Sequence, residues 1–231
     1  MAERIYNLFH LGYPDIQAWL RETDVVMVPI GSCEQHGLHL PVSVDSIACQ
    51  VPVELAAPRA EVPHTPTIWF GYSPQHVRGP GEGSGTVTLR ASTYQNVLYE
   101  VGRCLIHMGF NKIVYVTGHT SNLKVVDPAM RALRYDTGAI PCVFRADAEG
   151  IPPILSDILE NPPEETPGWH GSEIETSEVL AFDEKLAHLE RTDKDFTHAP
   201  AWLPQGFSKE NGSPFVKYKG WDLAYFPIDH P

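Results

Sequence analysis

Acidic and imidazole side chains follow directly after an apolar run near the start of the chain. The run at residues 25–30 is typical of a buried strand. The side chains that come within the next fifteen residues are Glu34, His36, His39 and Asp45. Sites in open α/β sheets form outside the carboxyl ends of strands, and carboxylates with imidazole suit Zn, Mn or Fe. These residues therefore predict a metal site, although any one of them alone could equally cap backbone groups in a polar loop.

A second apolar run, at residues 113–117, ends in the same way, with Gly118 and His119. A strand, a tight glycine turn, a polar cluster and then a helix repeat the pattern of the first loop. We therefore expect His119 to reach the same edge of the sheet as Glu34. Taken alone, His119 would be an ordinary hydrogen-bonded histidine.

The elements that must position these residues alternate between strand and helix. Strands are expected at about residues 24–30, 67–70, 113–117 and 140–144, and helices at about 45–57, 92–108, 123–135 and 174–182. Asp45 lies near the start of the first of these helices, where the helix dipole favours an acid whether or not it binds a metal. Glu173 and Glu175 stand at the start of the last helix, where the same dipole role applies.

A long glycine-rich loop follows the expected strand at 67–70. It spans residues 71–85 and carries Tyr72, Gln75, His76 and Arg78. Long loops in compact domains are usually functional or disordered, so we interpret this one as a flap that faces the substrate. Arg78 would meet a carboxylate or phosphate there, and a surface ion pair is an equally weighted role for it.

Composition limits the class of protein and its partners. The chain has 231 residues, 42% of them hydrophobic, and a net charge of -12 without a Lys/Arg cluster. This disfavours nucleic acid and anionic membranes as partners and leaves a small-molecule substrate. The start of the chain has no signal-peptide pattern, no run has the length of a transmembrane helix, and the four cysteines are scattered. We expect a cytoplasmic protein with one domain over residues 1–231, whose last 45 or so residues form an irregular aromatic tail.

The chain resembles the creatininase (creatinine amidohydrolase) family over about residues 20–185. The resemblance rests on four separated motifs in the family's order. They are PIGSCEQHGLHLP at 29–41 with Asp45, GTVTL at 85–89, GHTSN at 118–122 and HGSEIETS at 170–177. It implies a three-layer α/β/α fold with a mainly parallel central sheet, a centre of two divalent metal ions, and a homo-oligomer, often a hexamer.

The resemblance also implies roles for single residues. Glu34, Asp45 and His119 would hold one metal ion, and His36 with a second carboxylate the other, with Asp45 bridging. In creatininase that carboxylate lies in the turn after the matched histidine, where this chain has Ser121. Glu173 is the expected replacement, with a part in the catalytic site as well. His170 matches the catalytic histidine, while Trp169 and Thr86 are assigned to the substrate side.

The activity implied is hydrolysis of a bond next to a carbonyl, a cyclic amide C–N bond in the first interpretation. The flap is longer and more polar than the family's usual segment, which argues against creatinine as the substrate. An alternative keeps the metals but opens a cyclic polyol ketone, such as an oxidised inositol, at a C–C bond. A second alternative is a non-catalytic binding protein on the same fold.

Overall fold

The structure is a computed structural model that describes residues 4–77, 84–145, 158–160 and 170–192, with the backbone of three C-terminal strands. The chain divides into two compact units. The first comprises Met1–Glu34, Ser43–Pro74 and Val87–Ala148, and the second Gln35–Val42, Gln75–Thr86 and Glu149–Pro231. The single domain expected from the sequence stays a prediction.

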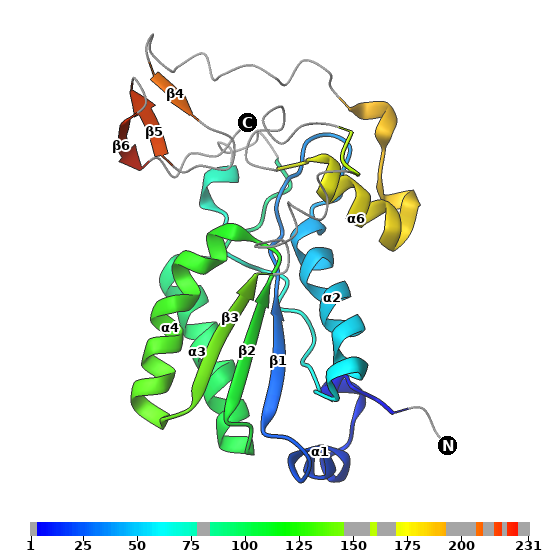
Figure 1. Ribbon diagram of the computed structural model, residues 1–231, viewed down its shortest axis with the longest axis vertical. Helices are drawn as coiled ribbons and strands as arrows, with labels where there is room; N and C mark the ends of the chain where they lie inside the picture. Colours follow the sequence, from blue (N-terminus) through cyan, green and yellow to red (C-terminus); the bar gives the residue numbers. More distant parts are fainter. Residues whose placement is uncertain are drawn as a thin grey trace. The chain divides into compact units, whose positions relative to one another are not determined.

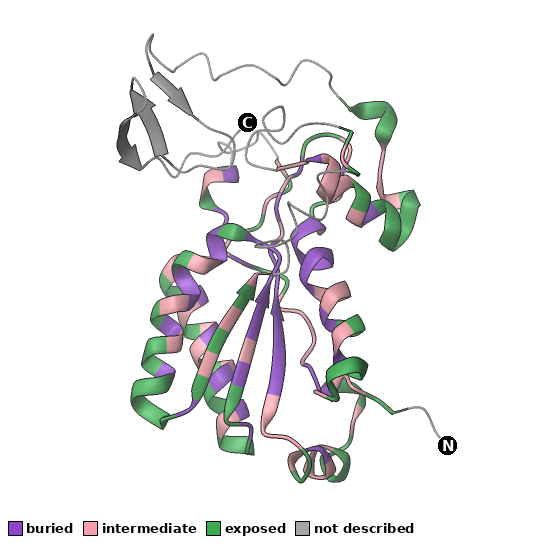
Figure 2. Ribbon diagram, viewed as in Figure 1, coloured by how far each residue is buried: buried purple, intermediate pink, exposed green. Residues whose placement is uncertain are grey.

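The first unit is built on a parallel sheet with the strand order β1-β2-β3. The strands are β1 (Val25–Ile30), β2 (Lys112–Thr117) and β3 (Ile140–Arg145) (Figure 1). Ile30 pairs with Thr117, so β1 and β2 end side by side. β1 is buried along nearly all its length, whereas β3 alternates between exposed and half-buried residues, as a strand at the edge of the described sheet should (Figure 2).

The other edge of β1 pairs with an extended segment at residues 63–68. The amide of Ile68 donates to the carbonyl of Pro29 at 2.9 Å, and the amide of Met27 donates to that of Pro63 at 3.0 Å. The strand expected at 67–70 is therefore wrong in detail, because the pairing is limited to isolated bridges at His64 and Ile68. Pro66 between them has no N–H to donate to a ladder.

Helices cover both faces of the sheet in the first unit. They are α2 (Val44–Ala60), α3 (Ala91–Met108) and α4 (Leu123–Thr137). α3 and α4 lie against one face and α2 against the other (Figure 1). From β1 the chain crosses through α2 to the segment at 63–68 and returns through α3 to β2. Strand–helix–strand crossovers are right-handed, so the change of direction puts α2 and α4 on opposite faces.

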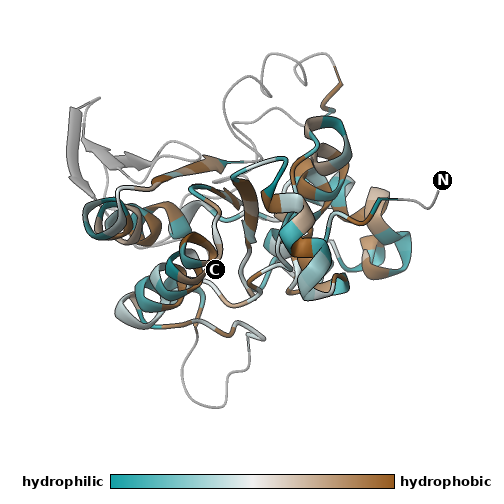
Figure 3. Cartoon of the chain, turned by 90° about the horizontal axis from the view of Figure 1, so that it is seen from below, coloured by the Kyte–Doolittle hydropathy of each residue, from teal (hydrophilic) through white to brown (hydrophobic). Residues whose placement is uncertain are grey.

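The side chains of β1 alternate between two hydrophobic clusters. Val26, Val28 and Ile30 pack with Leu98 of α3, Leu133 of α4 and their neighbours. Met27 and Val116 pack instead with residues of α2, namely Cys49, Val53 and Ala57. Each buried aliphatic side chain contributes about 1.5–3 kcal/mol, which holds a helix layer on each face. The exposed residues of α3 and α4 are mainly hydrophilic, and the layers are those that the sequence predicts (Figure 3).

The remaining elements are short helices and a second sheet. The described helices outside the three layers are η1 (Leu8–His10), α1 (Tyr13–Leu20), η2 (Pro74–His76), η3 (Thr120–Asn122), α6 (Glu173–Asp183), η6 (Glu184–Leu186) and η7 (Leu189–Arg191). The C-terminal stretch was expected to be irregular. Instead, its described backbone forms an antiparallel sheet of β4 (Phe207–Lys209), β5 (Phe215–Tyr218) and β6 (Trp221–Tyr225).

Two glycines allow the first turn of α2 to lie against the ends of β1 and β2. A Cβ added at Gly31 would overlap the backbone and side chain of Ser46. One added at Gly118 would overlap the carbonyl of Asp45 and lie 2.9 Å from the amide of Cys49. Because these neighbours include helix backbone, moving them aside would be costly. The position of Asp45 therefore depends on glycine, which has no Cβ, at residues 31 and 118.

Gly118→Ala should therefore displace α2 from the sheet and lower the free energy of unfolding by about 1–3 kcal/mol, the usual cost of overpacking. Urea unfolding of the purified protein measures this. Gly12→Ala is the control, since a Cβ there meets nothing closer than 3.5 Å and should change stability less. Equal midpoints for the two variants would contradict the close-packing argument.

Candidate metal centre

The first group of candidate ligands gathers where β1 and β2 end. Glu34 comes four residues after the end of β1 and His119 two residues after the end of β2. The strand order reverses between these two strands, since the chain first adds the segment at 63–68 on one side of β1 and then β2 on the other. Such a switch point is where open α/β sheets place their sites. Asp45, in the first turn of α2, completes the group.

These three side chains are buried and close to one another. Glu34, Asp45 and His119 are 1%, 2% and 6% exposed, and their ligand atoms lie within 4.8 Å of one another. Nε2 of His119 lies 3.2 Å from Oε2 of Glu34, and Nδ1 lies 3.3 Å from Oδ2 of Asp45. Two carboxylates taken out of water require compensating positive charge. The donor set of two oxygens and one nitrogen suits Zn, Mn or Fe.

The pKa of His119 indicates the same preference for positive charge at this place. Burial lowers the pKa of its imidazole, but the carboxylates of Asp45 and Glu34 outweigh burial and raise that pKa to about 9. A hydrogen bond with the carbonyl of Tyr72 adds to the rise. A position that stabilises an imidazolium against burial also favours a divalent cation, so the residues present fit a metal ion.

Two serine hydroxyls form a hydrogen-bonded chain that ends at His119. Nε2 of His119 lies 3.0 Å from the hydroxyl of Ser73, which in turn hydrogen-bonds the hydroxyl of Ser32. Asp45, His119 and Ser73 thus resemble a nucleophilic triad in their residue types. Ser73 is fully buried, however, so its hydroxyl cannot reach a substrate. Its place is that of a group that orients a metal-binding histidine.

Asn122 fixes the loops around this group. Its side-chain amide donates to the carbonyl of Gly31 at 2.9 Å and accepts from the backbone amide of Tyr72 at 3.1 Å. One buried side chain therefore joins the end of β1, the start of the flap and the turn after β2. Neither Asn122 nor Ser73 was singled out from the sequence, since an amide or hydroxyl in a loop gives no signal of its partner.

The second group of candidate ligands lies in the second unit. Nε2 of His36, a buried side chain, lies 3.7 Å from Oε1 of Glu175, near the start of α6. The other carboxylate oxygen of Glu175 accepts the backbone amide of Gly171. An imidazole and a carboxylate are again ligand types that suit Zn, Mn or Fe.

Glu173 does not take the place expected for it. Its carboxylate oxygens accept the amide of Glu160 at 2.9 and 3.0 Å. Ser172 caps α6 by accepting from the amide of Glu175, which sets the rotation of the helix. Two positions along a helix differ by about 200°, so only one of the two glutamates can face His36. The structure places Glu175 there.

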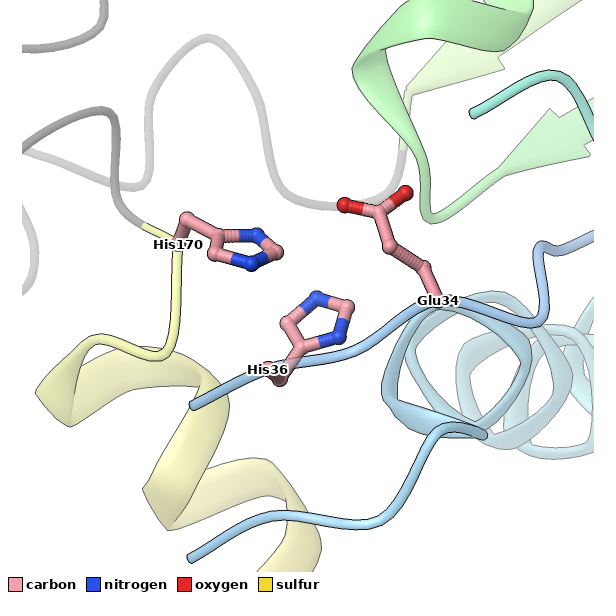
Figure 4. A group of neighbouring side chains, drawn as sticks. All are labelled: Glu34, His36 and His170. Atoms are coloured by element: carbon pink, nitrogen blue, oxygen red, sulfur yellow. The ribbon is translucent and has the colours of Figure 1, made fainter. Parts of the chain in front are cut away.

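Imidazole rings surround the expected catalytic histidine. The ring of His170 lies 4.2 Å from that of His36, measured between centroids, and the two rings face each other (Figure 4). The ring of His76 stacks on His170 at 4.5 Å with an angle of 19° between the planes. His76 is only 5% exposed and is part of this cluster. Its expected contact with the substrate stays a prediction.

The other residues expected on the substrate side have mixed outcomes. Tyr72 offers its carbonyl to His119, and its side chain packs against the larger core cluster. The hydroxyl of Thr86 accepts the amide of Gln35 at 3.0 Å, and Gln75 is half-buried beside His76 in the chain. Arg78 and Trp169 lie outside the described residues.

Residues 10–218 match the family Creatininase, described as creatinine amidohydrolase. The chain belongs to the creatininase family. The crystal structure of a creatinine amidohydrolase (creatininase) superposes with a TM-score of 0.71 at 29% identity, covering 88% of this chain and 81% of that one. The resemblance and the α/β fold expected from the sequence are thereby confirmed.

Relatives in the creatininase family differ in what they act on. A creatinine amidohydrolase from Pseudomonas putida is 29% identical over 78% of this chain and 71% of its own length. A mycofactocin precursor peptide peptidase from Mycolicibacterium smegmatis is 33% identical over 61% of this chain and 59% of its own. A 3-dehydro-scyllo-inosose hydrolase from Thermotoga maritima is 26% identical over 89% and 65%. The chain thus covers less than two thirds of the last two relatives.

Solved creatininases also bear on the metal. One is described as "Creatininase Mn" and matches with a TM-score of 0.69 at 28% identity, over 87% of this chain and 81% of that one. A Glu-to-Gln mutant of "Zn-Zn type" matches with 0.68 at 26%, over 88% and 81%. Separately, no described helix of this protein is both long and apolar enough to cross a membrane.

Exchanging each of the two glutamates separately tests the second ligand group. Glu175→Gln replaces a charged donor beside His36 by a neutral amide and should weaken metal binding at that group at least about tenfold. Metal content after dialysis against zinc buffers measures this. Glu173→Gln is the matched control on the same helix and should bind like the unchanged protein. A loss in the control alone would restore Glu173 as the ligand.

Proposed function

We propose that this creatininase-family protein is a metal-dependent hydrolase that cleaves a cyclic amide, or another C–N bond next to a carbonyl, in a small polar substrate. The observation that supports this most is the buried group of Glu34, Asp45 and His119 at the switch point of the sheet. A protein that only bound a neutral ligand would have no use for two buried carboxylates around one imidazole, since their desolvation is costly.

The proposal has two ligand groups, and each would hold one metal ion. Glu34 of the first group and His36 of the second are separated in the chain only by Gln35. Glu34, Asp45 and His119 would hold one ion, and His36 with Glu175 would contribute to a second. The solved creatininases described with Mn and as Zn-Zn type support these metals as first choices, and Fe fits the same donors.

The chemistry divides between the ions and the side chains. Bound divalent ions lower the pKa of water toward neutrality and polarise a carbonyl. In the hydrolysis, the oxygen of water adds to the carbonyl carbon, the C–N bond breaks, and the nitrogen takes up a proton. His170 is the proposed donor of that proton, because an imidazole exchanges protons readily near neutral pH. His36 and His76 pack against its ring and orient it.

A second candidate function is the opening of a cyclic polyol ketone at a C–C bond. The inosose hydrolase from Thermotoga maritima matches 89% of this chain, more than the creatinine amidohydrolase does. Polar residues of the flap such as Gln75, and Thr86 directly after the flap, suit a substrate rich in hydroxyls. The same residues would activate water, and the proton would go to carbon instead of nitrogen. The expected homo-oligomer and cytoplasmic location stay predictions.

Metal content decides between a hydrolase and a binding protein. Protein purified without added metal or chelator should hold about two equivalents of Zn, Mn or Fe per chain. His119→Ala should lose the ion at the first group and the turnover together. Chelation should abolish turnover, and reloading should restore it. A protein that stays metal-free on reloading would leave only the binding-protein alternative.

The products then separate the two hydrolase candidates. Screening creatinine, other cyclic amides and oxidised inositols for consumption, with detection of ammonia or amine groups, identifies C–N cleavage. Consumption of an inosose without a new amine identifies C–C cleavage. Turnover of none of these classes by metal-loaded protein would contradict both candidates.

Replacing the proposed proton donor should separate binding from chemistry. His170→Ala should keep the metal bound at the first group, because its ligands come from other segments. Its turnover should fall about 100-fold or more, the usual contribution of a positioned acid or base. Metal analysis and steady-state rates measure both effects. A variant with near-normal turnover would remove His170 from the mechanism.

A further inference from the structure

Gln35 has a side-chain orientation that its surroundings fix. The backbone amide of Gly37 donates to Oε1 of Gln35 at 3.1 Å. A backbone N–H can only donate, so the atom that faces it must be the carbonyl oxygen of the carboxamide. The NH₂ group of Gln35 must therefore point the other way.

That NH₂ group faces two imidazole rings. Nε2 of Gln35 lies 3.2 Å from Nδ1 of His76 and 3.2 Å from Nε2 of His170. The amide nitrogen donates two hydrogen bonds and accepts no hydrogen bond, so the ring nitrogens opposite it are acceptors. A neutral imidazole that accepts at one nitrogen carries its proton on the other. The proton of His170 is then on Nδ1, and that of His76 is on Nε2.

A closed ring of hydrogen bonds holds Gln35 and His76 relative to each other. The hydroxyl of Ser84 donates to the carbonyl of His76 at 2.9 Å and accepts the amide of Thr86 at 3.3 Å. The hydroxyl of Thr86 accepts the amide of Gln35 at 3.0 Å, and the side chain of Gln35 returns to His76. The stacking of His76 on His170 adds a flat surface that limits rotation of the His170 ring.

We propose that Gln35 and His76 are positioning residues that fix the tautomer of His170, with its proton on Nδ1. Gln35 selects the tautomer by donating to Nε2, and His76 holds the ring plane. The neutral ring keeps this proton, so Nδ1–H can donate a hydrogen bond to a substrate, a use that rests on the proposed hydrolase function. The tautomer itself follows from the contacts of Gln35 whatever the reaction.

Nitrogen NMR of ring-labelled histidine tests the tautomer directly, because protonated and unprotonated ring nitrogens resonate far apart. Zinc-loaded and metal-free protein are both measured, and His170→Asn assigns the signals. In the unchanged protein we expect a protonated Nδ1 and an unprotonated Nε2 for His170. The carboxylate that Gln35→Glu introduces can only accept, so this variant should move the proton to Nε2 of His170.

Two further variants keep the test decisive. Gln17→Glu on α1 makes the same change of charge away from the cluster and should leave the His170 signals unchanged. If Gln35→Glu does not fold, Gln35→Leu removes the donor at similar volume and should release the proton of His170 to either nitrogen. A protonated Nε2 in the unchanged protein, or a His170 spectrum that neither Gln35 variant alters, would overturn the proposal.

The outcome is separable from that of the hydrolase proposal. Protein that binds zinc and turns over a substrate, yet shows the opposite tautomer, would refute the role of Gln35 and leave the function standing. Protein that shows the expected tautomer but cannot be loaded with metal would refute the function and leave the role of Gln35 standing.

Discussion

The close approach of the first turn of α2 to the ends of β1 and β2 is the constraint on which the first ligand group depends. Gly31 and Gly118 make it possible, because a side chain at either would occupy the space of Ser46 or of the α2 backbone. Through this contact Asp45 reaches the imidazole of His119, which β2 delivers. The hydrophobic layers of the sheet provide the stability that keeps such a polar group buried.

Burial and charge act against each other within that group. The two carboxylates lose the stabilisation that hydration gives them. A positive charge between them compensates for that loss. The pKa of His119 is raised to about 9 in spite of burial, because the carboxylates of Asp45 and Glu34 favour a positive charge at this place. A metal ion would also supply this positive charge. Hydrogen bonds with Ser73 and with the carbonyl of Tyr72 keep the imidazole of His119 in place.

The segment Glu34-Gln35-His36 contributes residues to both units. The boundary between the units falls between Glu34 and Gln35, so neighbouring residues serve different surroundings. Glu34 joins the ligands at the sheet, whereas Gln35 and His36 join the imidazole cluster with His170 and Glu175. In the proposed function, the motif therefore links metal binding to proton transfer through three consecutive residues. Substrate choice among the family's reactions must come from other residues, because these ligand types suit several of those reactions alike.

The sequence by itself determined the three strands of the parallel sheet, the main helices and the ligand types at the strand ends. Hydrophobic runs that end in glycine and then Glu34 or His119 identify buried strands and the sheet edge that carries the site, because side chains after parallel neighbouring strands must meet. Four ordered motifs were enough to indicate the family. These signals are local in the chain, so they can be read without knowing any tertiary contact.

Only the tertiary structure decided between residues that look alike in sequence. Glu173 and Glu175 are both acids in the first turn of α6, and the cap at Ser172 fixes the rotation that turns Glu175 toward His36. The stacking of the buried His76 on His170 was likewise not visible in the sequence. The histidine partners of Gln35 and the serine and histidine partners of Ser73 are 41 or more positions away in the chain. Helix rotation and contacts at such sequence distances are set by packing, which leaves no periodic trace in the residues themselves.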